Sequence, residues 1–165
     1  MSKSEDFLKE AFAGESQANR KYLAFAKKAD EEGYPQAGRL FRAAAEAETV
    51  HAHAHLRAWK GVGATTDNLK AAVAGETHEF THMYPEMIEA ARAEANKEAE
   101  RTFTYANEVE KVHAALYQKL LDVLGSPQGD YPYWVCPVCG YTAEKEHPER
   151  CPVCNAKGDR FLKID

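Results

Sequence analysis

Two Glu-x-x-His pairs are the residues of this 165-residue chain best suited to metal chemistry. Glu48 and His51 form one pair, and Glu110 and His113 form the other. Three residues along an α-helix correspond to a rotation of about 300°, so both side chains of a pair project from one helix face, one turn apart. A buried carboxylate beside a buried imidazole is costly unless the two are paired or bind a metal. The spacing therefore predicts metal ligands on two helices.

An internal repeat places a further carboxylate before each pair. Glu15 lies in Ala-Gly-Glu-Ser, and Glu76 lies in the matching Ala-Gly-Glu-Thr, 61 residues later. Such a repeat predicts two helix pairs related by an approximate two-fold axis. One Glu from each of two helices plus Glu-x-x-His from each of two others is the donor set of di-iron carboxylate proteins with a ferritin-like bundle. A single pair could be a solvated product of Glu-rich helices, but two matched pairs favour a di-iron site.

Glu79 departs from the symmetry of the repeat. It lies three residues after Glu76 on the same helix face, whereas the matching position in the first half is Ala18. Two stacked carboxylates on a buried face repel each other without a cation between them, so Glu79 is a candidate fifth carboxylate. Tyr22 and Tyr84 lie close to the carboxylates along the sequence. Either could hydrogen-bond a ligand carboxylate or be an ordinary core tyrosine.

All four cysteines lie in two Cys-x-x-Cys pairs near the end of the chain. The pairs are Cys136 with Cys139 and Cys151 with Cys154, separated by eleven residues. Each Cys-x-x-Cys turn directs two thiolates at one point, so two turns predict a tetrahedral four-sulfur metal site rather than disulfides. Zinc ribbons and one-iron rubredoxin sites share this pattern, and the cysteines alone do not choose between zinc and iron.

Composition divides the chain near residue 125. Residues 1–130 carry 16 Lys/Arg against 21 Asp/Glu, and residues 131–165 carry five of each, so the net charge of −5 belongs to the first part. The sequence Gly-Ser-Pro-Gln-Gly-Asp at 125–130 is the break between them. We therefore expect a helical domain over 1–130, linker included, and a small metal-stapled domain over 131–165.

Glycine and proline positions divide the first part into four long helices. The expected ranges are 4–32, 35–60, 67–94 and 97–124. Helices of this length favour an all-α four-helix bundle over a mixed fold.

Charge and hydropathy exclude several classes of protein. No apolar run approaches the roughly 20 residues that cross a bilayer, so no membrane partner is expected. The start, Met-Ser-Lys-Ser-Glu-Asp, lacks the apolar segment of a secretory signal peptide. A mildly acidic chain without a basic block is a poor candidate for binding nucleic acid.

Along essentially its whole length the chain resembles the rubrerythrins. The resemblance rests on these motifs: Ala13-Gly-Glu-Ser16, Glu48-x-x-His51, Gly75-Glu76-x-x-Glu79, Met83-Tyr-Pro85, Glu110-x-x-His113 and the two rubredoxin-like cysteine turns. It implies a ferritin-like four-helix bundle with a small C-terminal rubredoxin-like domain of strands and loops. The implied function is a non-haem di-iron peroxidase of the microbial cytoplasm, which protects against oxidative stress by reducing hydrogen peroxide to water. Electrons would come from a reductase or a rubredoxin and enter through the Fe(Cys)4 centre.

The resemblance also implies roles for the ligands. Glu48 and Glu110 would bridge the two irons, and Glu15 and Glu76 would be terminal ligands. His113 would bind one iron.

The second iron would exchange His51 for Glu79 as its redox state changes, so His51 and Glu79 are expected to take part in catalysis with Tyr22 and Tyr84 near them. The four cysteines would hold a third iron, for which zinc could substitute.

Two alternative functions remain open at this point. A ferroxidase or iron-storage protein would use the bundle but would need no electron-transfer tail. A zinc-stapled, non-catalytic helical scaffold would need no iron, and its pure protein would be colourless, whereas ferric thiolate is red.

Two distances predict a homodimer. From Glu110 to Leu124 is about 21 Å of helix, so the metal of the tail is expected to start far from the di-iron site of its own chain, with a partner's tail as the better electron donor. Residues 61–66 reach at most about 20 Å, against roughly 33 Å needed to join parallel second and third helices at the level of their ligands. Either a third helix that starts late, or helix pairs exchanged between two chains, would remove this conflict.

Overall fold

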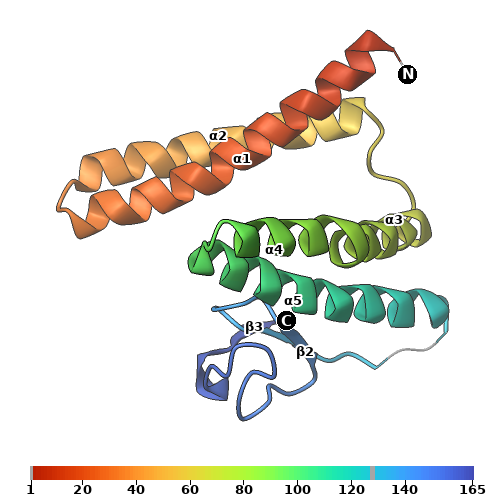
Figure 1. The fold of residues 1–165 in the computed structure, drawn as a ribbon. Helices are drawn as coiled ribbons and strands as arrows, with labels where there is room; N and C mark the ends of the chain where they lie inside the picture. The colour runs from red at the N-terminus through yellow and green to blue at the C-terminus, as the bar shows by residue number, and fades with distance from the viewer. Residues whose placement is uncertain (1, 127–128) are drawn as a thin grey trace. The chain divides into compact units, whose positions relative to one another are not determined.

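The computed structural model describes residues 2–126 and 129–165, so Pro127 and Gln128 of the expected linker lie outside the described residues. The chain is mostly helical and ends in a small three-stranded sheet, which confirms the predicted fold class (Figure 1). It divides into two compact units, Met1–Gly63 and Ala64–Asp165, called here the N-terminal and C-terminal units. None of the described helices is long and apolar enough to span a membrane.

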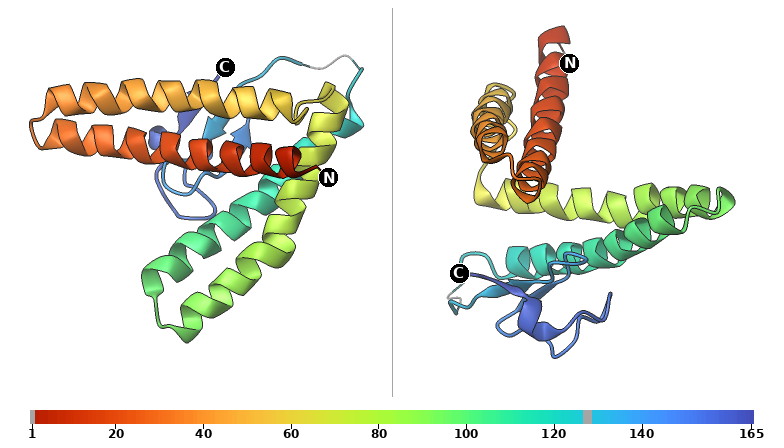
Figure 2. Two further views of the ribbon diagram at one scale, coloured as in Figure 1. Left: turned by 90° about the horizontal axis from the view of Figure 1, so that it is seen from above. Right: turned by 90° about the vertical axis from the view of Figure 1, so that its left-hand side faces the viewer.

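The N-terminal unit is a hairpin of two long helices, α1 (Lys3–Glu31) and α2 (Pro35–Ala58). Gly33 takes a left-handed conformation with φ of +79° at the turn, and Pro35 begins α2 at a position where the missing N–H costs nothing. The two helices run side by side along their length (Figure 2). Alanines make much of the contact between them, since Ala26, Ala29 and Ala45 are buried, and such small side chains allow close packing.

The first long helix of the C-terminal unit differs from the single helix expected over 67–94. It consists of α3 (Thr65–His78), a five-residue π-helix η1 (Glu79–Met83) and α4 (Tyr84–Ala93). In the π-helical turn the N–H of Tyr84 donates to the carbonyl of Glu79, five residues earlier. Pro85 follows at once and has no N–H with which to continue the α-helical pattern.

Helix α5 (Lys97–Asp122) returns alongside α3 and α4. The connection places Ala95 in the left-handed region with φ of 57°, and the Asn96 side chain caps α5 by accepting the N–H of Ala99 at 3.1 Å. This hairpin brings the Glu76 and Glu110 segments of the sequence repeat side by side.

The tail forms a sheet of three short strands, β1 (Tyr133–Val135), β2 (Thr142–Glu144) and β3 (Leu162–Ile164), with a 3-10 turn η2 (Gly158–Arg160) before β3. The strand order is β2-β1-β3, and both pairs are antiparallel. Cys136, Cys151 and Phe161 form its buried core, against which Trp134 and Tyr141 pack.

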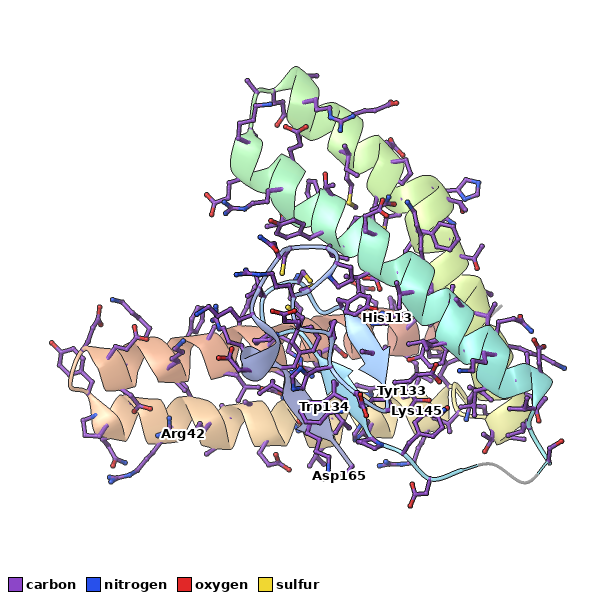
Figure 3. All side chains as sticks on the ribbon, turned by 90° about the horizontal axis from the view of Figure 1, so that it is seen from below. Arg42, His113, Tyr133, Trp134, Lys145 and Asp165 are labelled. Carbon is purple, nitrogen blue, oxygen red and sulfur yellow. The ribbon has the colours of Figure 1, made fainter. Side chains whose placement is uncertain are left out.

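Contrary to the expected separation of the tail from its own bundle, the tail folds back along α5, with its strands beside the helix at His113 (Figure 3). Thr142 Oγ1 of β2 lies 3.0 Å from His113 Nε2, and Glu144 Oε2 lies 2.5 Å from Lys119 Nζ. The expectation of a distant tail metal was wrong because it followed the chain to the end of α5 without the return path through the linker.

Candidate metal centres

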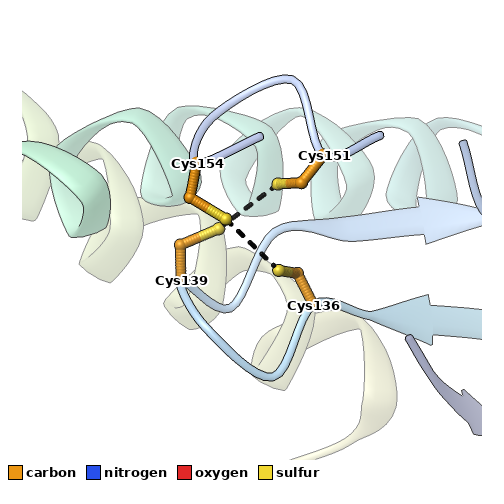
Figure 4. Close-up of side chains that lie close together, drawn as sticks. All are labelled: Cys136, Cys139, Cys151 and Cys154. Atoms are coloured by element: carbon orange, nitrogen blue, oxygen red, sulfur yellow. Dashed lines mark hydrogen bonds between the residues drawn. The ribbon is translucent and has the colours of Figure 1, made fainter. Parts of the chain in front are cut away.

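Four cysteine sulfurs come together in the tail. Cys136 Sγ lies 3.6 Å from Cys154 Sγ, and Cys139 Sγ lies 3.4 Å from Cys151 Sγ (Figure 4). Each Cys-x-x-Cys turn is closed by a backbone hydrogen bond, in which Gly140 N–H donates to Cys136 O and Asn155 N–H donates to Cys151 O, both at 2.9 Å. The residue that closes each turn has a positive φ, so both turns reverse tightly and direct their thiols at one point.

The electrostatics of this cluster suit a cation. Burial raises the pKa of the Cys136 thiol, but the N–H groups of Val138 and Cys139 and the neighbouring thiols outweigh it and hold the pKa below its ordinary value. Burial also raises the pKa of Cys154, and here the pKa stays above its ordinary value. Four thiolates at these distances repel one another without a metal, and an all-sulfur donor set suits zinc or iron.

The N-terminal unit carries one carboxylate and imidazole cluster, formed by Glu15 of α1 with Glu48 and His51 of α2. Their ligand atoms all lie within 4.8 Å of one another. His51 Nδ1 lies 2.8 Å from Glu48 Oε2. The helices are tied together beside this cluster, because the Asn19 amide donates to the carbonyl of Ala45 at 2.7 Å.

The C-terminal unit carries the matching cluster, formed by Glu76 of α3 with Glu110 and His113 of α5. His113 Nδ1 lies 2.7 Å from Glu110 Oε2. Burial and the neighbouring Glu110 carboxylate raise the pKa of Glu76. The protein therefore brings two acidic groups together at an electrostatic cost that a bound cation would remove.

Glu79 lies at the start of the π-helix and is exposed enough to reach solvent while remaining beside the acidic cluster. Burial, and then the charge of Glu76, raise its pKa. It is not part of the tight cluster of Glu76, Glu110 and His113.

Two models of known families match this chain. The family described as Rubrerythrin matches residues 6–121, and the one described as Rubrerythrin, rubredoxin-like domain matches residues 134–162. The chain belongs to the rubrerythrin family. Rubrerythrin-2 of Clostridium acetobutylicum is 41% identical, with 94% of each chain covered. Nigerythrin of Nitratidesulfovibrio vulgaris is 37% identical over 93% of this chain and 83% of the relative.

Solved structures of nigerythrin agree with this assignment. The structures titled partially reduced state and fully reduced, all ferrous state match with TM-scores of 0.60 and 0.58. Both are 35% identical and cover 99% of this chain and 88% of the matched chain. Rubrerythrins are oxidoreductases that carry a di-iron site and a rubredoxin-like four-cysteine site, and the described residues offer donors for each.

The two tyrosines named from the sequence have different surroundings. Tyr84 faces the acidic cluster, since burial and the charges of Glu110, Glu79 and Glu76 raise its pKa. Tyr22 is half-buried and packs against the rings of Phe25 and Phe41, with centroids 6.3 and 6.2 Å away.

Tyr117 is a residue beside the cluster that the sequence reasoning missed. Burial is the largest cause that raises the pKa of Tyr117, and the charges of Glu76 and Glu110 raise this pKa further. It lines a cavity of about 300 Å³ together with His113 and Thr142. The repeat gave no signal because the matching position in the first half is His55, but the spacing of four residues from His113 places both on one helix face.

Proposed function

We propose that this rubrerythrin-family protein is a non-haem di-iron peroxidase that reduces hydrogen peroxide to water and protects its cell against oxidative stress. The observation that carries the proposal is the contact between the four-cysteine tail and the acidic cluster, where Thr142 Oγ1 lies 3.0 Å from His113 Nε2. An iron-storage or ferroxidase bundle has no need of an electron-transfer centre against one of its ligands. A zinc-stapled scaffold has no need of two acidic clusters.

The proposed di-iron ligands combine the two clusters with Glu79. Glu48 and Glu110 would bridge the metals, Glu15 and Glu76 would be terminal, and His113 would bind one iron. Support comes from the donor set, because carboxylate and imidazole ligands from four helical segments suit iron in a helical bundle.

The exchange of His51 for Glu79 at the second iron has its own support. His51 Nδ1 faces Glu48, and no residue in the described chain hydrogen-bonds its Nε2. His113 is held at both ring nitrogens. A histidine held at one nitrogen only is the easier of the two to displace.

Protein side chains supply protons to the proposed reaction. Two bound ferrous ions supply the two electrons that cleave the O–O bond, and forming two waters consumes two protons. Tyr84 and Tyr117 keep their phenolic protons at neutral pH, since burial and the nearby carboxylates raise their pKa. Each can therefore donate a hydrogen bond or a proton toward the two oxygens that form when the O–O bond breaks.

The proposed functional domains are a helical domain, residues 1–130, and a tail domain, residues 131–165. The tail domain is proposed as the entry point for electrons. A four-thiolate iron centre carries one electron at a time, which suits repeated reduction of the helical site. An external reductase or a rubredoxin would be the donor, in the cytoplasm, where cysteines stay available for metal.

A homodimer with exchanged helix pairs is also proposed. Its support is the short connection between α2 and α3. Helix α2 ends at Ala58 and α3 begins at Thr65. The six connecting residues reach at most about 20 Å, whereas parallel α2 and α3 would need about 31 Å to bring Glu48 and Glu76 level. Pairing with a second copy satisfies both limits.

The test is the stoichiometry of peroxide reduction. Iron-loaded protein, reduced without oxygen, is mixed with limiting hydrogen peroxide while electron loss and dioxygen release are followed. One peroxide consumed for every two electrons, with no dioxygen released, is expected. Dioxygen release would indicate catalase chemistry, growth of a ferric mineral would indicate storage, and a colourless protein inert to peroxide would indicate the scaffold.

A further inference from the structure

We propose that Thr142 is a positioning residue for His113: the Thr142 hydroxyl hydrogen-bonds Nε2 of the ring and leaves Nδ1 as the metal-binding atom. The inference rests on the proposed role of His113 as a ligand. It joins the tail to the acidic cluster through one side chain, although Thr142 belongs to neither metal-binding motif of the sequence.

The Thr142 hydroxyl contacts one ring nitrogen of His113. Thr142 Oγ1 lies 3.0 Å from His113 Nε2, and it also donates to the carbonyl of Gly140 at 3.1 Å. With its proton on Gly140, the oxygen is placed to accept the N–H that an imidazole bound to metal through Nδ1 carries on Nε2.

The other ring nitrogen faces Glu110. His113 Nδ1 lies 2.7 Å from Glu110 Oε2, and Glu76 completes a cluster whose ligand atoms all lie within 4.8 Å of one another. Either a proton on Nδ1 or a metal ion can lie between the nitrogen and the carboxylate. The Thr142 bond thus prepares the pair for a metal, in the way that outer hydrogen bonds orient ligating histidines.

The surroundings hold Thr142 in place. It pairs with Val135 in the sheet, and Gly140, with φ of +86°, lies against α5 so closely that a Cβ there would be 3.7 Å from Val109 Cγ1. On the other side of Thr142, Glu144 is paired with Lys119 of α5 at 2.5 Å. The tail around strand β2 therefore contacts α5 on both sides of His113, at Val109 and at Lys119.

The first test observes His113 in the zinc-loaded protein. Nitrogen NMR of the ring, assigned with His113→Gln, is expected to show zinc on Nδ1 and a proton on Nε2 in the wild type and in Thr142→Ser, which keeps the hydroxyl. Thr142→Val keeps the β-branched shape without the hydroxyl and is expected to lose this fixed state, while the His51 signals stay unchanged. Zinc on Nε2 in the wild type overturns the proposal whether or not the variants fold.

The second test measures metal affinity apart from activity. The four-cysteine site is first filled with zinc, and cobalt is then titrated into the helical site and followed by its visible spectrum. Thr142→Val is expected to bind cobalt about tenfold to a hundredfold more weakly than the wild type, and Thr142→Ser about equally well. Equal affinity in Thr142→Val, or equal weakening in Thr142→Ser, would contradict the proposal.

The two proposals fail separately. A protein with the expected His113 state and cobalt affinities that does not reduce peroxide would overturn the proposed function and leave the role of Thr142 standing. A protein that reduces peroxide, but whose cobalt affinity is unchanged in Thr142→Val, would overturn the role of Thr142 and leave the proposed function standing.

Discussion

The two acidic clusters share ligand types but hold their histidines differently. His113 is fixed between Glu110 and Thr142, and 26% of its side chain is exposed. Among the described residues, Glu48 alone hydrogen-bonds the His51 ring, and 56% of the His51 side chain is exposed. Sequence symmetry between the two Glu-x-x-His pairs therefore conceals a difference that arises from the tail. At this scale we expect one constant and one exchangeable histidine ligand.

Replacing Glu79 with alanine is expected to preserve the fold and most bound iron but to slow peroxide turnover by roughly tenfold to a hundredfold. The reason is that Glu79 lies beside the tight cluster and not within it. Iron content and steady-state peroxide consumption check the prediction, with Glu89→Ala, an exposed carboxylate of α4, as control. Full activity in Glu79→Ala would remove Glu79 from the mechanism.

Replacing Glu76 with glutamine is expected to stabilise the metal-free protein at pH 7. Burial and Glu110 raise the pKa of Glu76 in the folded state, so its favourable contribution is present below the unfolded pKa and is lost as pH rises through the folded pKa. The gain should vanish near pH 4 and stay below about 1 kcal/mol, because water screens this partly exposed group. Urea unfolding measures it, with Glu89→Gln as control, and a less stable Glu76→Gln at pH 7 would contradict it.

At the scale of elements, helix ends were predictable and the π-helical turn was not. Gly33 and Pro35 mark a helix stop and start by their backbone chemistry alone, and α1 and α2 end and begin there. The π-helix adds one residue to a single turn, and over so short a segment this shift lies within the ordinary irregularity of hydrophobic spacing. Glu79, at the start of that turn, lies outside the tight cluster of Glu76, Glu110 and His113.

The position of the tail against α5 could not be predicted from the sequence either. Its cysteine spacing predicts the four-cysteine cluster because the ligands are local in sequence. Its contact with α5 depends on single long-range pairs, such as Lys119 with Glu144, and no periodicity reports such pairs. For the same reason, the contact between Thr142 and His113 could not be predicted from the sequence.

Replacing Cys139 with serine is expected to abolish the red ferric-thiolate colour and sustained peroxide turnover. A single oxidation of the reduced helical site by peroxide should remain, because its ligands lie on helices and not in the tail. Visible spectra and stopped-flow mixing check both parts. Val138→Ser, in the same turn but without a thiolate, is the control, and loss of the single oxidation in Cys139→Ser would show that the two centres are not separable.

At the scale of the whole molecule, each compact unit holds one Glu-x-x-His cluster, so the proposed di-iron ligand set draws on both units. The short connection from Ala58 to Thr65 favours supplying them from two chains. Light scattering is expected to show a dimer. A fully active monomer would contradict both the dimer and the exchange.

Complementation distinguishes an exchanged dimer from an ordinary one. Glu48→Ala alters one unit and Glu110→Ala the other, and each variant alone is expected to be inactive. When the two are refolded together, exchange makes one intact site in every mixed dimer, so activity should return to about a quarter of the wild-type value. Without exchange every site keeps one defect, and no activity returns.

The choice of oxidant tests the central claim most directly. Iron-loaded protein is reduced without oxygen and mixed in a stopped-flow instrument with hydrogen peroxide or, separately, with dioxygen at equal concentration. A peroxidase with an electron-transfer centre against its helical site is expected to be reoxidised faster by peroxide, without accumulation of ferric mineral. Faster reoxidation by dioxygen, with mineral accumulating, would contradict the account and support iron storage.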